Sequence, residues 1–223
     1  MVNLIIDDRP ITAEHGETIL QAARENGIAI PTLCYHEAVE PYAACRLCVV
    51  ELVGARGSKL VAACTQPCEE GMTVRTSSQP VQASRRITAE LLMATGAHLP
   101  LVQAIAGAMG VQSVRHTLPP DDCILCGLCV RACDQLVGAH AISLIQRGLN
   151  KRYAAPFEIT SAACIGCATC VLICPTGAIT LADIAPAPHS AHDARTCRIC
   201  GEQTLPVHFA DAEALLKEEV QPL

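Results

Sequence analysis

The chain has 223 residues, a formal net charge of −6, 2% aromatic side chains and no tryptophan. The acidic balance argues against a surface for nucleic acid or anionic membranes, and the scarcity of aromatic residues argues against one large conventional core. No stretch reaches the roughly 18 apolar residues of a membrane span, and the first residues lack the basic and apolar regions of a signal peptide.

The N-terminal part predicts strands around one helix. Residues 2–6 and 10–13 predict two strands. Thr18 is placed to cap a helix that ends before Gly27. Three further strands are predicted at residues 49–53, 59–63 and 72–76. This order of strand, strand, helix, loop and strands is typical of a β-grasp ferredoxin.

Four cysteines of this part have a metal-like arrangement. They are Cys34, Cys45, Cys48 and Cys64. Four thiolates on loops around one helix-and-sheet unit suit a 2Fe–2S cluster, although the spacing is not the C-x4-C-x2-C of plant-type ferredoxins. A fifth cysteine, Cys68, has no matching role, and we interpret it as a spare thiol near the cluster.

Residues 79–116 predict a linker of two helices. The first begins near Pro80, which suits the first turn of a helix. Its apolar face is formed by Ile87, Leu91 and Leu92. The second begins after Pro100 and ends at Gly110. The core side of this second helix is expected to hold Leu101, Val102, Ile105 and Met109.

Residues 117–185 contain two copies of the pattern C-x2-C-x2-C-x3-C, which ligates 4Fe–4S clusters. In this pattern three cysteines bind one cluster and the fourth binds the other. One cluster is therefore assigned to Cys123, Cys126, Cys129 and Cys174. The other is assigned to Cys164, Cys167, Cys170 and Cys133. Zinc is the competing interpretation, but a zinc site would leave the third cysteine of each triplet unused.

Other residues of this repeat carry further expectations. Gly127 and Gly166 lie between ligands, where the backbone must pass close to sulfur without a side chain. After its last cysteine, the first copy of the pattern has Asp134, where the second copy has a proline. An insert follows Asp134 in the first copy. A βαββαβ-like fold with two-fold symmetry is predicted. Its expected strands are residues 141–144, 157–159 and 178–181, with a polar loop at residues 147–156.

The C-terminal part, residues 186–223, follows a stiff linker at residues 185–188. Two histidines and a C-x2-C pair suit a tetrahedral zinc site. These predicted ligands are His189, His192, Cys197 and Cys200. His208 is a substitute ligand, and residues 211–220 predict a short amphipathic helix. An additional iron–sulfur cluster shared with a partner, a redox-active dithiol and no metal at all remain open as alternatives.

The sequence letters PTLCYH, ACRLCVVEL and LVAACTQPCEEGM, together with the two cysteine runs, resemble one family of redox subunits. This family includes the diaphorase iron–sulfur subunit of NAD-reducing hydrogenases and the N-terminal parts of the complex I large iron–sulfur subunit and of iron-only hydrogenases. Similar subunits occur in NAD-linked formate dehydrogenases. The resemblance implies the 2Fe–2S ligand set named above.

This sequence departs from much of that family in one respect. Complex I-type subunits carry a cluster held by one histidine and three cysteines, but here no cysteine occurs between Cys68 and Cys123. His98 and His116 cannot hold a cluster alone, and we interpret both as surface or packing residues. The chain therefore resembles a shortened branch of the family, nearer to a hydrogenase or dehydrogenase accessory subunit.

Together these features predict an α+β chain with four parts, at residues 1–78, 79–116, 117–185 and 186–223. Clusters ligated only by cysteine pass single electrons, and the sequence has neither a G-x-G-x-x-G motif nor a P-loop, so no catalytic residue is expected. The resemblance implies a hetero-oligomer with a flavin/NAD(P)H-binding subunit and a catalytic hydrogenase or formate-dehydrogenase-type subunit.

Two other classes of function fit these features less well. A free-standing polyferredoxin-like carrier would need no docking tail. A redox sensor or cluster scaffold would have labile clusters with an exposed ligand, whereas every cysteine run here is complete. Fifteen cysteines could also indicate a secreted disulfide protein. The odd count and the metal-like spacing favour a reducing cytoplasm instead.

Overall fold

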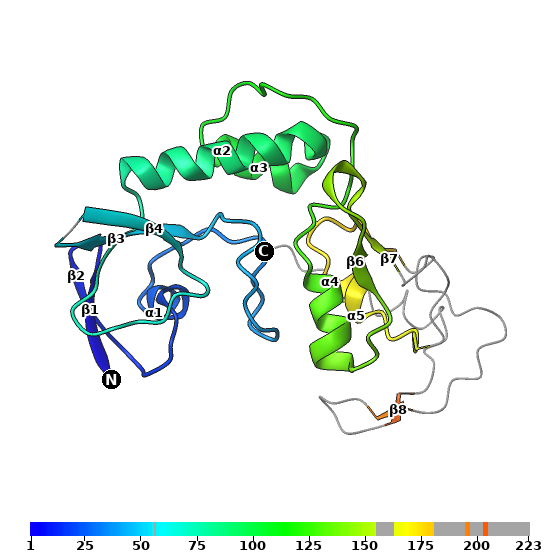
Figure 1. The fold of residues 1–223 in the computed structure, drawn as a ribbon, viewed down its shortest axis with the longest axis horizontal. Helices are drawn as coiled ribbons and strands as arrows, with labels where there is room; N and C mark the ends of the chain where they lie inside the picture. Colours follow the sequence, from blue (N-terminus) through cyan, green and yellow to red (C-terminus); the bar gives the residue numbers. More distant parts are fainter. Residues whose placement is uncertain (56, 155–162, 181–194, 197–202, 205–223) are drawn as a thin grey trace. The chain divides into compact units, whose positions relative to one another are not determined.

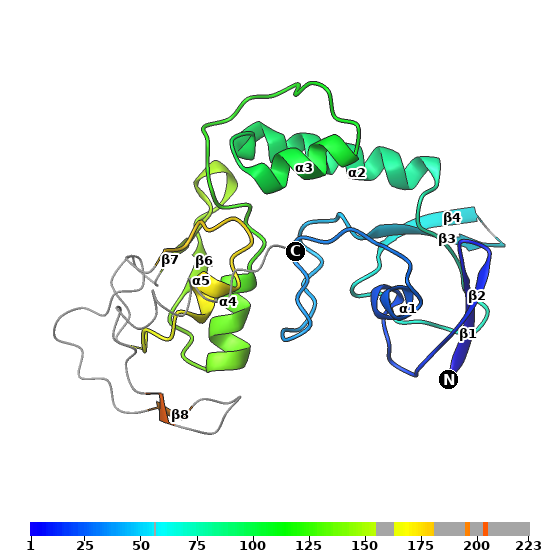
Figure 2. The same cartoon turned by 180° about the vertical axis from the view of Figure 1, so that it is seen from behind.

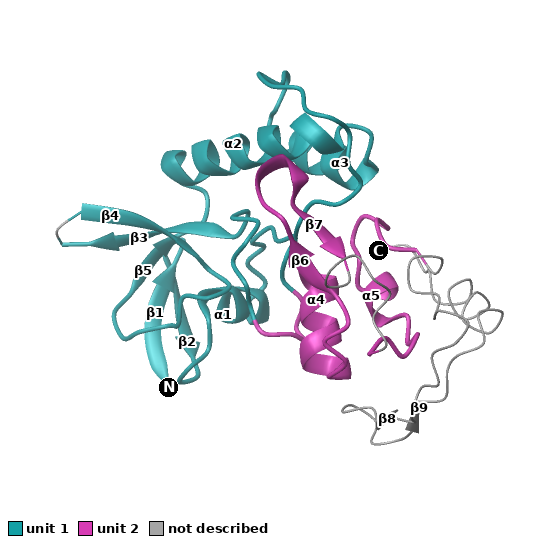
Figure 3. Ribbon diagram, turned by 45° about the vertical axis from the view of Figure 1, so that its right-hand side comes forward, with its two compact units in different colours: residues 1–35, 41–126 teal, residues 36–40, 127–223 magenta. Residues whose placement is uncertain are grey.

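The computed structural model describes residues 1–55, 57–154, 163–180, 195–196 and 203–204. The chain divides into two compact units, coloured teal and magenta in Figure 3. Unit 1 comprises Met1–Tyr35 and Pro41–Cys126, and unit 2 comprises His36–Glu40 and Gly127–Leu223. None of the helices described is both long and apolar enough to cross a membrane.

Unit 1 is built on a five-stranded sheet with the order β2-β1-β5-β3-β4 (Figure 3). The strands are β1 (Val2–Ile6), β2 (Arg9–Ala13), β3 (Val49–Gly54), β4 (Gly57–Ala62) and β5 (Thr73–Arg75). Only the β1–β5 pair is parallel, with Ile5 opposite Thr73, and the other pairs are antiparallel. In β1 alternate residues are buried, as expected for a sheet with one face on the core. These elements confirm the strands predicted for this part of the chain.

Helix α1 (Ile19–Glu25) begins where the sequence predicted. The hydroxyl oxygen of Thr18 accepts a hydrogen bond from the backbone N–H of Gln21, and the Gln21 side chain accepts one from the backbone N–H of Thr18. This capping box satisfies two N–H groups that a helix start leaves unpaired. Ile19 and Leu20 are fully buried, and each contributes about 1.5–3 kcal/mol to stability through that burial.

Helices α2 (Gln79–Gly96) and α3 (Pro100–Ala108) form a hairpin, and Figures 1 and 2 show them side by side from opposite directions. Both helices start with proline in the first turn, as predicted. The apolar face expected on α2 is largely exposed, because Ile87 is 50% and Leu91 59% accessible to solvent. Instead, the buried side of this helix carries Val81, Arg85 and Ala89.

The segment after α3 returns along α2 and is held there by an ion pair. Arg115 donates from its backbone N–H and from Nε to Oε1 of Glu90, at 2.8 and 2.7 Å, and from Nη2 to Oε2 at 2.8 Å. The backbone N–H of Leu118 also donates to the carbonyl of Ala94 at 2.9 Å. These bonds place the residues that lead into the first cysteine run.

The Glu90–Arg115 pair predicts a specific pH dependence. Hydrogen bonds from Arg115 lower the pKa of Glu90 from 4.5 to about 2. The stabilisation is therefore complete above pH 4.5 and is lost only as the pH falls toward 2. We expect Glu90→Gln to lower the melting temperature by about 1–3 °C, because an exposed ion pair contributes little.

Between about pH 8 and pH 5.5 this difference should stay constant, since the carboxylate is ionised in both the folded and the unfolded chain. Thermal unfolding of both proteins across that range measures it. The matched variant is Arg115→Met, and the double variant should be no less stable than Glu90→Gln alone. A difference that grows or shrinks across this range would contradict the assigned role of the pair.

Unit 2 contains α4 (Leu128–Arg131), the π-helix η1 (Ala132–Val137) and α5 (Thr169–Leu172). Strand β6 (Ser143–Ile145) pairs antiparallel with β7 (Arg152–Ala154), and the 3-10 helix η2 (Gly148–Asn150) joins them. A last pair, β8 (Arg195–Thr196) and β9 (Gln203–Thr204), is also antiparallel.

Four expectations for unit 2 need correction or remain untested. The polar loop predicted at residues 147–156 contains β7, which completes a hairpin with β6. The first expected strand is shifted from residues 141–144 to β6. Residues 178–180 are described and are not in a strand, so the expected two-fold pattern is not complete there. The strand expected at residues 157–159 lies outside the described residues.

Residues 36–40 belong to unit 2 although most neighbouring residues in the sequence belong to unit 1. The backbone N–H of Glu40 donates to Oε1 of Gln135 at 2.8 Å, and Nη1 of Arg131 donates to the Glu40 carbonyl. Arg131 is almost fully buried. This short segment is therefore fixed by hydrogen bonds to α4 and η1, the helical segment that contains Cys129 and Cys133.

Candidate iron–sulfur sites

The structure brings together the four cysteines predicted for the 2Fe–2S cluster, all in unit 1. Cys34 follows the extended segment after α1, Cys45 and Cys48 precede β3, and Cys64 follows β4. The Sγ atoms of Cys48 and Cys64 are 3.4 Å apart, and the backbone N–H of Cys45 lies 3.4 Å from Sγ of Cys34. The four thiols thus form two adjacent pairs. This arrangement fits a cluster of two irons with four thiolate ligands.

Within each pair, the hydrogen bond between the two thiols lowers the pKa of one and raises that of the other. A hydrogen bond with Cys34 lowers the pKa of Cys45 to about 5, and the pKa of Cys34 rises correspondingly. A hydrogen bond with Cys64 lowers the pKa of Cys48 to about 7, while that of Cys64 rises. Iron binds the thiolate, so occupation of this site displaces the remaining protons. The buried setting and the sulfur chemistry fit the predicted group.

Cys68 lies in the same core but has different partners. It is 5% exposed, and its backbone N–H donates to the carbonyl of Glu17 at 2.8 Å. Burial raises the pKa of its thiol to about 11, and the charge of Glu17 adds to this rise. These contacts agree with a spare core thiol rather than a ligand.

Unit 2 contains a hollow with about 370 Å³ of atom-free space, part of which is open to solvent. It is lined by the four cysteines assigned to the second 4Fe–4S cluster, Cys133, Cys164, Cys167 and Cys170. Cys133 lies on η1 and Cys170 on α5, so the fourth cysteine of one run meets the triplet of the other. The remaining lining is almost entirely aliphatic, including Val137, Ile142 and Ile165. A sulfur-lined apolar hollow fits a 4Fe–4S cluster, which needs thiolates and little water.

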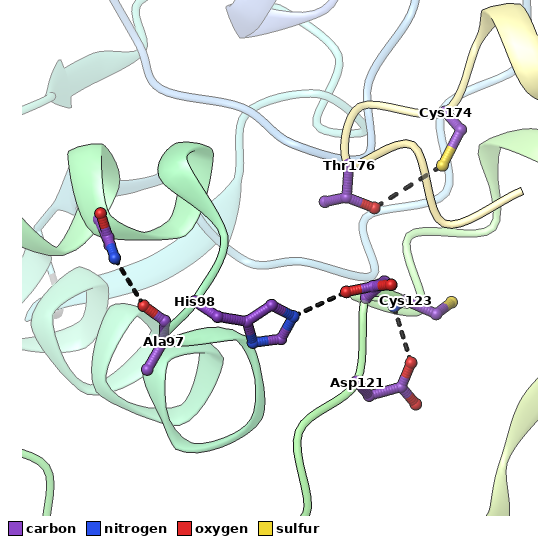
Figure 4. Close-up of polar contacts among 8 residues, drawn as sticks. Ala97, His98, Asp121, Cys123, Cys174 and Thr176 are labelled. Carbon is purple, nitrogen blue, oxygen red and sulfur yellow. Dashed lines mark hydrogen bonds and ion pairs between the residues drawn. The ribbon is translucent and has the colours of Figure 1, made fainter.

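The four cysteines assigned to the first 4Fe–4S cluster are divided between the units. Cys123 and Cys126 belong to unit 1, and Cys129 and Cys174 belong to unit 2. Their grouping around one cluster therefore stays a prediction. Near Cys174, the hydroxyl of Thr176 lies 3.7 Å from the sulfur (Figure 4).

The approach to Cys123 is fixed by two aspartates. The backbone N–H of Cys123 donates to Oδ1 of Asp121 at 2.8 Å, and Nε2 of His98 lies 2.7 Å from Oδ1 of Asp122. Figure 4 shows the ring of His98 pointing toward this loop. His98 is thus an exposed residue in contact with Asp122, as expected for a surface histidine, and His116 is exposed as well.

A left-handed residue lies inside every C-x2-C step of the three predicted sites. These residues are Arg46, Leu125, Gly127, Gly166 and Ala168, with φ between 54° and 71°. This conformation turns the backbone tightly enough to direct successive thiols to one side. Only two of the five are glycines, so sequence reasoning missed the other three. A non-glycine residue in this region costs about 1–2 kcal/mol.

The left-handed position at Gly166, with φ +68°, yields a prediction. Gly166→Ala should destabilise unit 2 by about 1 kcal/mol and lower the temperature at which the 4Fe–4S absorbance is lost by about 2–4 °C. The matched control is Ala168→Gly, at φ +58° in the same loop. Its relief of strain is offset by the loss of a buried methyl, so it should stay within about 0.5 kcal/mol of wild type. Equal losses of stability in the two variants would show that the left-handed φ at Gly166 is not the cause of the destabilisation.

The C-terminal metal prediction is not tested by the structure. His189, His192, Cys197, Cys200 and the substitute His208 all lie outside the described residues. Within the described residues, no three His, Cys, Asp or Glu side chains converge as they would on a single metal ion. The zinc site and its alternatives stay predictions.

Comparison with known families identifies both cluster-binding parts. A 2Fe-2S iron-sulfur cluster binding domain matches residues 1–79, and a 4Fe-4S dicluster domain matches residues 122–178. One 2Fe–2S and two 4Fe–4S clusters, and the α+β fold class, are thereby confirmed.

Several curated proteins are similar to the chain. It is 32% identical over 204 residues to the alpha subunit of an NADPH-Fe(3+) oxidoreductase of Geobacter sulfurreducens, covering 80% of this chain and 24% of that protein. It is 32% identical over 211 residues to NADP-reducing hydrogenase subunit HndD of Solidesulfovibrio fructosivorans, covering 80% of this chain and 36% of that protein. The chain thus spans about a quarter to a third of these relatives.

Among solved structures, a chain of an NAD+-reducing NiFe-hydrogenase in the H2-reduced state is similar at a TM-score of 0.62 and 29% identity. This match covers 91% of the present chain and 90% of the hydrogenase chain. The likeness in length and fold therefore extends over almost the whole of both.

Proposed function

Because the chain belongs to the family of iron–sulfur subunits of NAD(P)-linked oxidoreductases and hydrogenases, we propose that it is the electron-transfer subunit of a hetero-oligomeric oxidoreductase. It would pass single electrons between a flavin/NAD(P)H-binding subunit and a catalytic subunit of hydrogenase or formate-dehydrogenase type. The observation that carries this proposal is the convergence of two complete cysteine sets, one in each unit.

The residues of the chain have defined tasks in this proposal. Cys34, Cys45, Cys48 and Cys64 hold the 2Fe–2S cluster, and the two cysteine runs hold the 4Fe–4S clusters in the crossed pattern described above. Bound clusters supply one-electron transfer. The buried core around Cys48 would keep water from the 2Fe–2S cluster, and mostly aliphatic side chains line the hollow around Cys170. Backbone N–H groups point at sulfur, as from Ala141 to Cys133 at 3.3 Å, and such bonds stabilise the reduced state.

The proposed partners follow from the electron count and from the relatives. A hydride donor gives two electrons and each cluster accepts one, so a flavin on another subunit would divide the pair. The lack of cysteines between Cys68 and Cys123 removes the cluster that complex I-type subunits hold there. The absence of that cluster favours a hydrogenase or dehydrogenase accessory subunit. We also propose a cytoplasmic location for the complex.

The decisive experiment is anaerobic purification of the tagged chain from its native host, with identification of bound proteins, metals and flavin. A bound flavin subunit with nickel would support a hydrogenase, and flavin with molybdenum or tungsten would support a formate dehydrogenase. The alternative is a free-standing polyferredoxin-like carrier. Recovery of the chain alone with about ten irons would favour that carrier over the fixed subunit.

A further inference from the structure

One buried charge of unit 1 has no part in the proposed ligand sets. Arg85 is 7% exposed and lies on the buried side of α2, one turn from Val81 and one turn from Ala89, which are both fully buried. Arginine is rarely buried unless its charge is compensated. The next residue, Arg86, is exposed and donates from Nε to the carbonyl of Met109. An apolar residue at position 85 would be the ordinary choice for this helix face.

The contact that Arg85 makes is next to the 2Fe–2S site. Its Nη2 donates to the carbonyl of Val49 at 2.7 Å, and Val49 directly follows Cys48. Burial lowers the pKa of the Arg85 guanidinium, and the charges of Cys48 and Asp7 partly oppose this shift. Among the described residues no carboxylate forms an ion pair with Arg85, and its buried Nε has no hydrogen-bond partner.

A cluster with four thiolates is anionic, with a charge of roughly −2 when oxidised, and reduction adds one more negative charge. A fixed positive charge in a buried, low-dielectric setting interacts more strongly with the reduced state than with the oxidised one. We propose that Arg85 is a positioning residue for the 2Fe–2S cluster, which holds the backbone at Val49 and raises the reduction potential of the cluster. This inference rests on the proposed 2Fe–2S ligand set.

A role in setting the reduction potential and a role in packing predict different results when Arg85 is replaced. Arg85→Met removes the desolvation cost of the buried charge but also its hydrogen bond to the Val49 carbonyl, so its melting temperature should stay within a few degrees of wild type. It should also lower the ratio of reduced to oxidised 2Fe–2S cluster about tenfold at a fixed ambient potential. For a one-electron couple, a tenfold change corresponds to about 59 mV.

The experiment is an EPR-monitored redox titration of the full chain with its clusters, compared among wild type and three variants. Arg85→Lys keeps the charge and should stay within about threefold of the wild-type ratio. Arg86→Met removes the same charge from the exposed side of the same helix and should leave the ratio unchanged, because solvent screens it. The 4Fe–4S signals of each sample give an internal reference that none of the variants should shift.

The outcomes decide between the interpretations. An unchanged potential in Arg85→Met, or an equal shift in Arg86→Met, would overturn the proposal. If Arg85→Met does not hold the cluster, Arg85→Gln is titrated instead, and loss of the cluster there too would assign Arg85 a structural role only. The absence of any 2Fe–2S signal in the wild-type chain would refute the proposed ligand set. If the wild-type chain shows the 2Fe–2S signal and its reduction potential is the same in Arg85→Met, only the role of Arg85 is refuted.

Discussion

Cys64→Ala is expected to remove the 2Fe–2S cluster, whereas Cys68→Ala, four residues later, should leave it bound. Both side chains are buried, at 1% and 5% exposure, so the two changes remove a sulfur from similar surroundings. Only Cys64 is paired with another predicted ligand, at 3.4 Å from Cys48. Iron per chain should fall from about ten to about eight in Cys64→Ala, with loss of the 2Fe–2S EPR signal.

Cys68→Ala serves as the matched control for this experiment. It should retain all of the iron and lose about 1–2 kcal/mol of stability, because it leaves a small gap in the hydrophobic core to which Cys68 belongs. Iron analysis and EPR of the anaerobically purified proteins measure both variants. If Cys68→Ala lost the cluster and Cys64→Ala kept it, the ligand set would have to be reassigned.

Cys133→Ala and Cys170→Ala are expected to lose the same 4Fe–4S signal, although the two residues belong to different cysteine runs. The reason is that both sulfurs line one hollow in unit 2, together with Cys164 and Cys167. Loss of one ligand opens one corner of a cubane, which converts or releases that cluster and spares the other. EPR spectra of the dithionite-reduced proteins should therefore be alike and should retain the 2Fe–2S signal.

Cys174→Ala provides the complementary control, since Cys174 ends the second cysteine run but is assigned to the first 4Fe–4S cluster. This substitution should remove the 4Fe–4S signal that Cys133→Ala and Cys170→Ala retain. A result in which Cys133→Ala instead matched Cys129→Ala would mean that each run binds its own cluster. The crossed assignment would then be wrong.

Features that depend on local chemistry were predicted well from the sequence. The thiols of Cys34, Cys45, Cys48 and Cys64 are brought together as expected, because four ligands on the loops of a β-grasp unit have few ways to meet. The start of α1 at Thr18 was also predicted, because a capping box is encoded within four residues. The start of the helix is encoded in residue type and spacing alone, whereas the 2Fe–2S ligand set was also implied by the family resemblance.

Features that depend on packing were predicted poorly. Helix α2 has apolar residues on more than one side, so periodicity alone could not show that Ile87 and Leu91 face solvent while Arg85 is buried. The β6–β7 hairpin was missed because its strands are only three residues long and lie among polar residues. Left-handed conformations at Leu125 and Ala168 were also hidden, since only glycine signals such a turn in a sequence.

The parallel pairing of β1 with β5 imposes an order on folding. Ile5 pairs with Thr73, so β1 cannot complete its pairing in the sheet until β5 has been made. Pairings between residues so distant in sequence form slowly, because the loop-closure entropy precedes any gain in contacts. All four predicted 2Fe–2S ligands lie within this loop. A cluster bound by these ligands would shorten the loop that has to close and so lower the entropy cost of pairing β1 with β5.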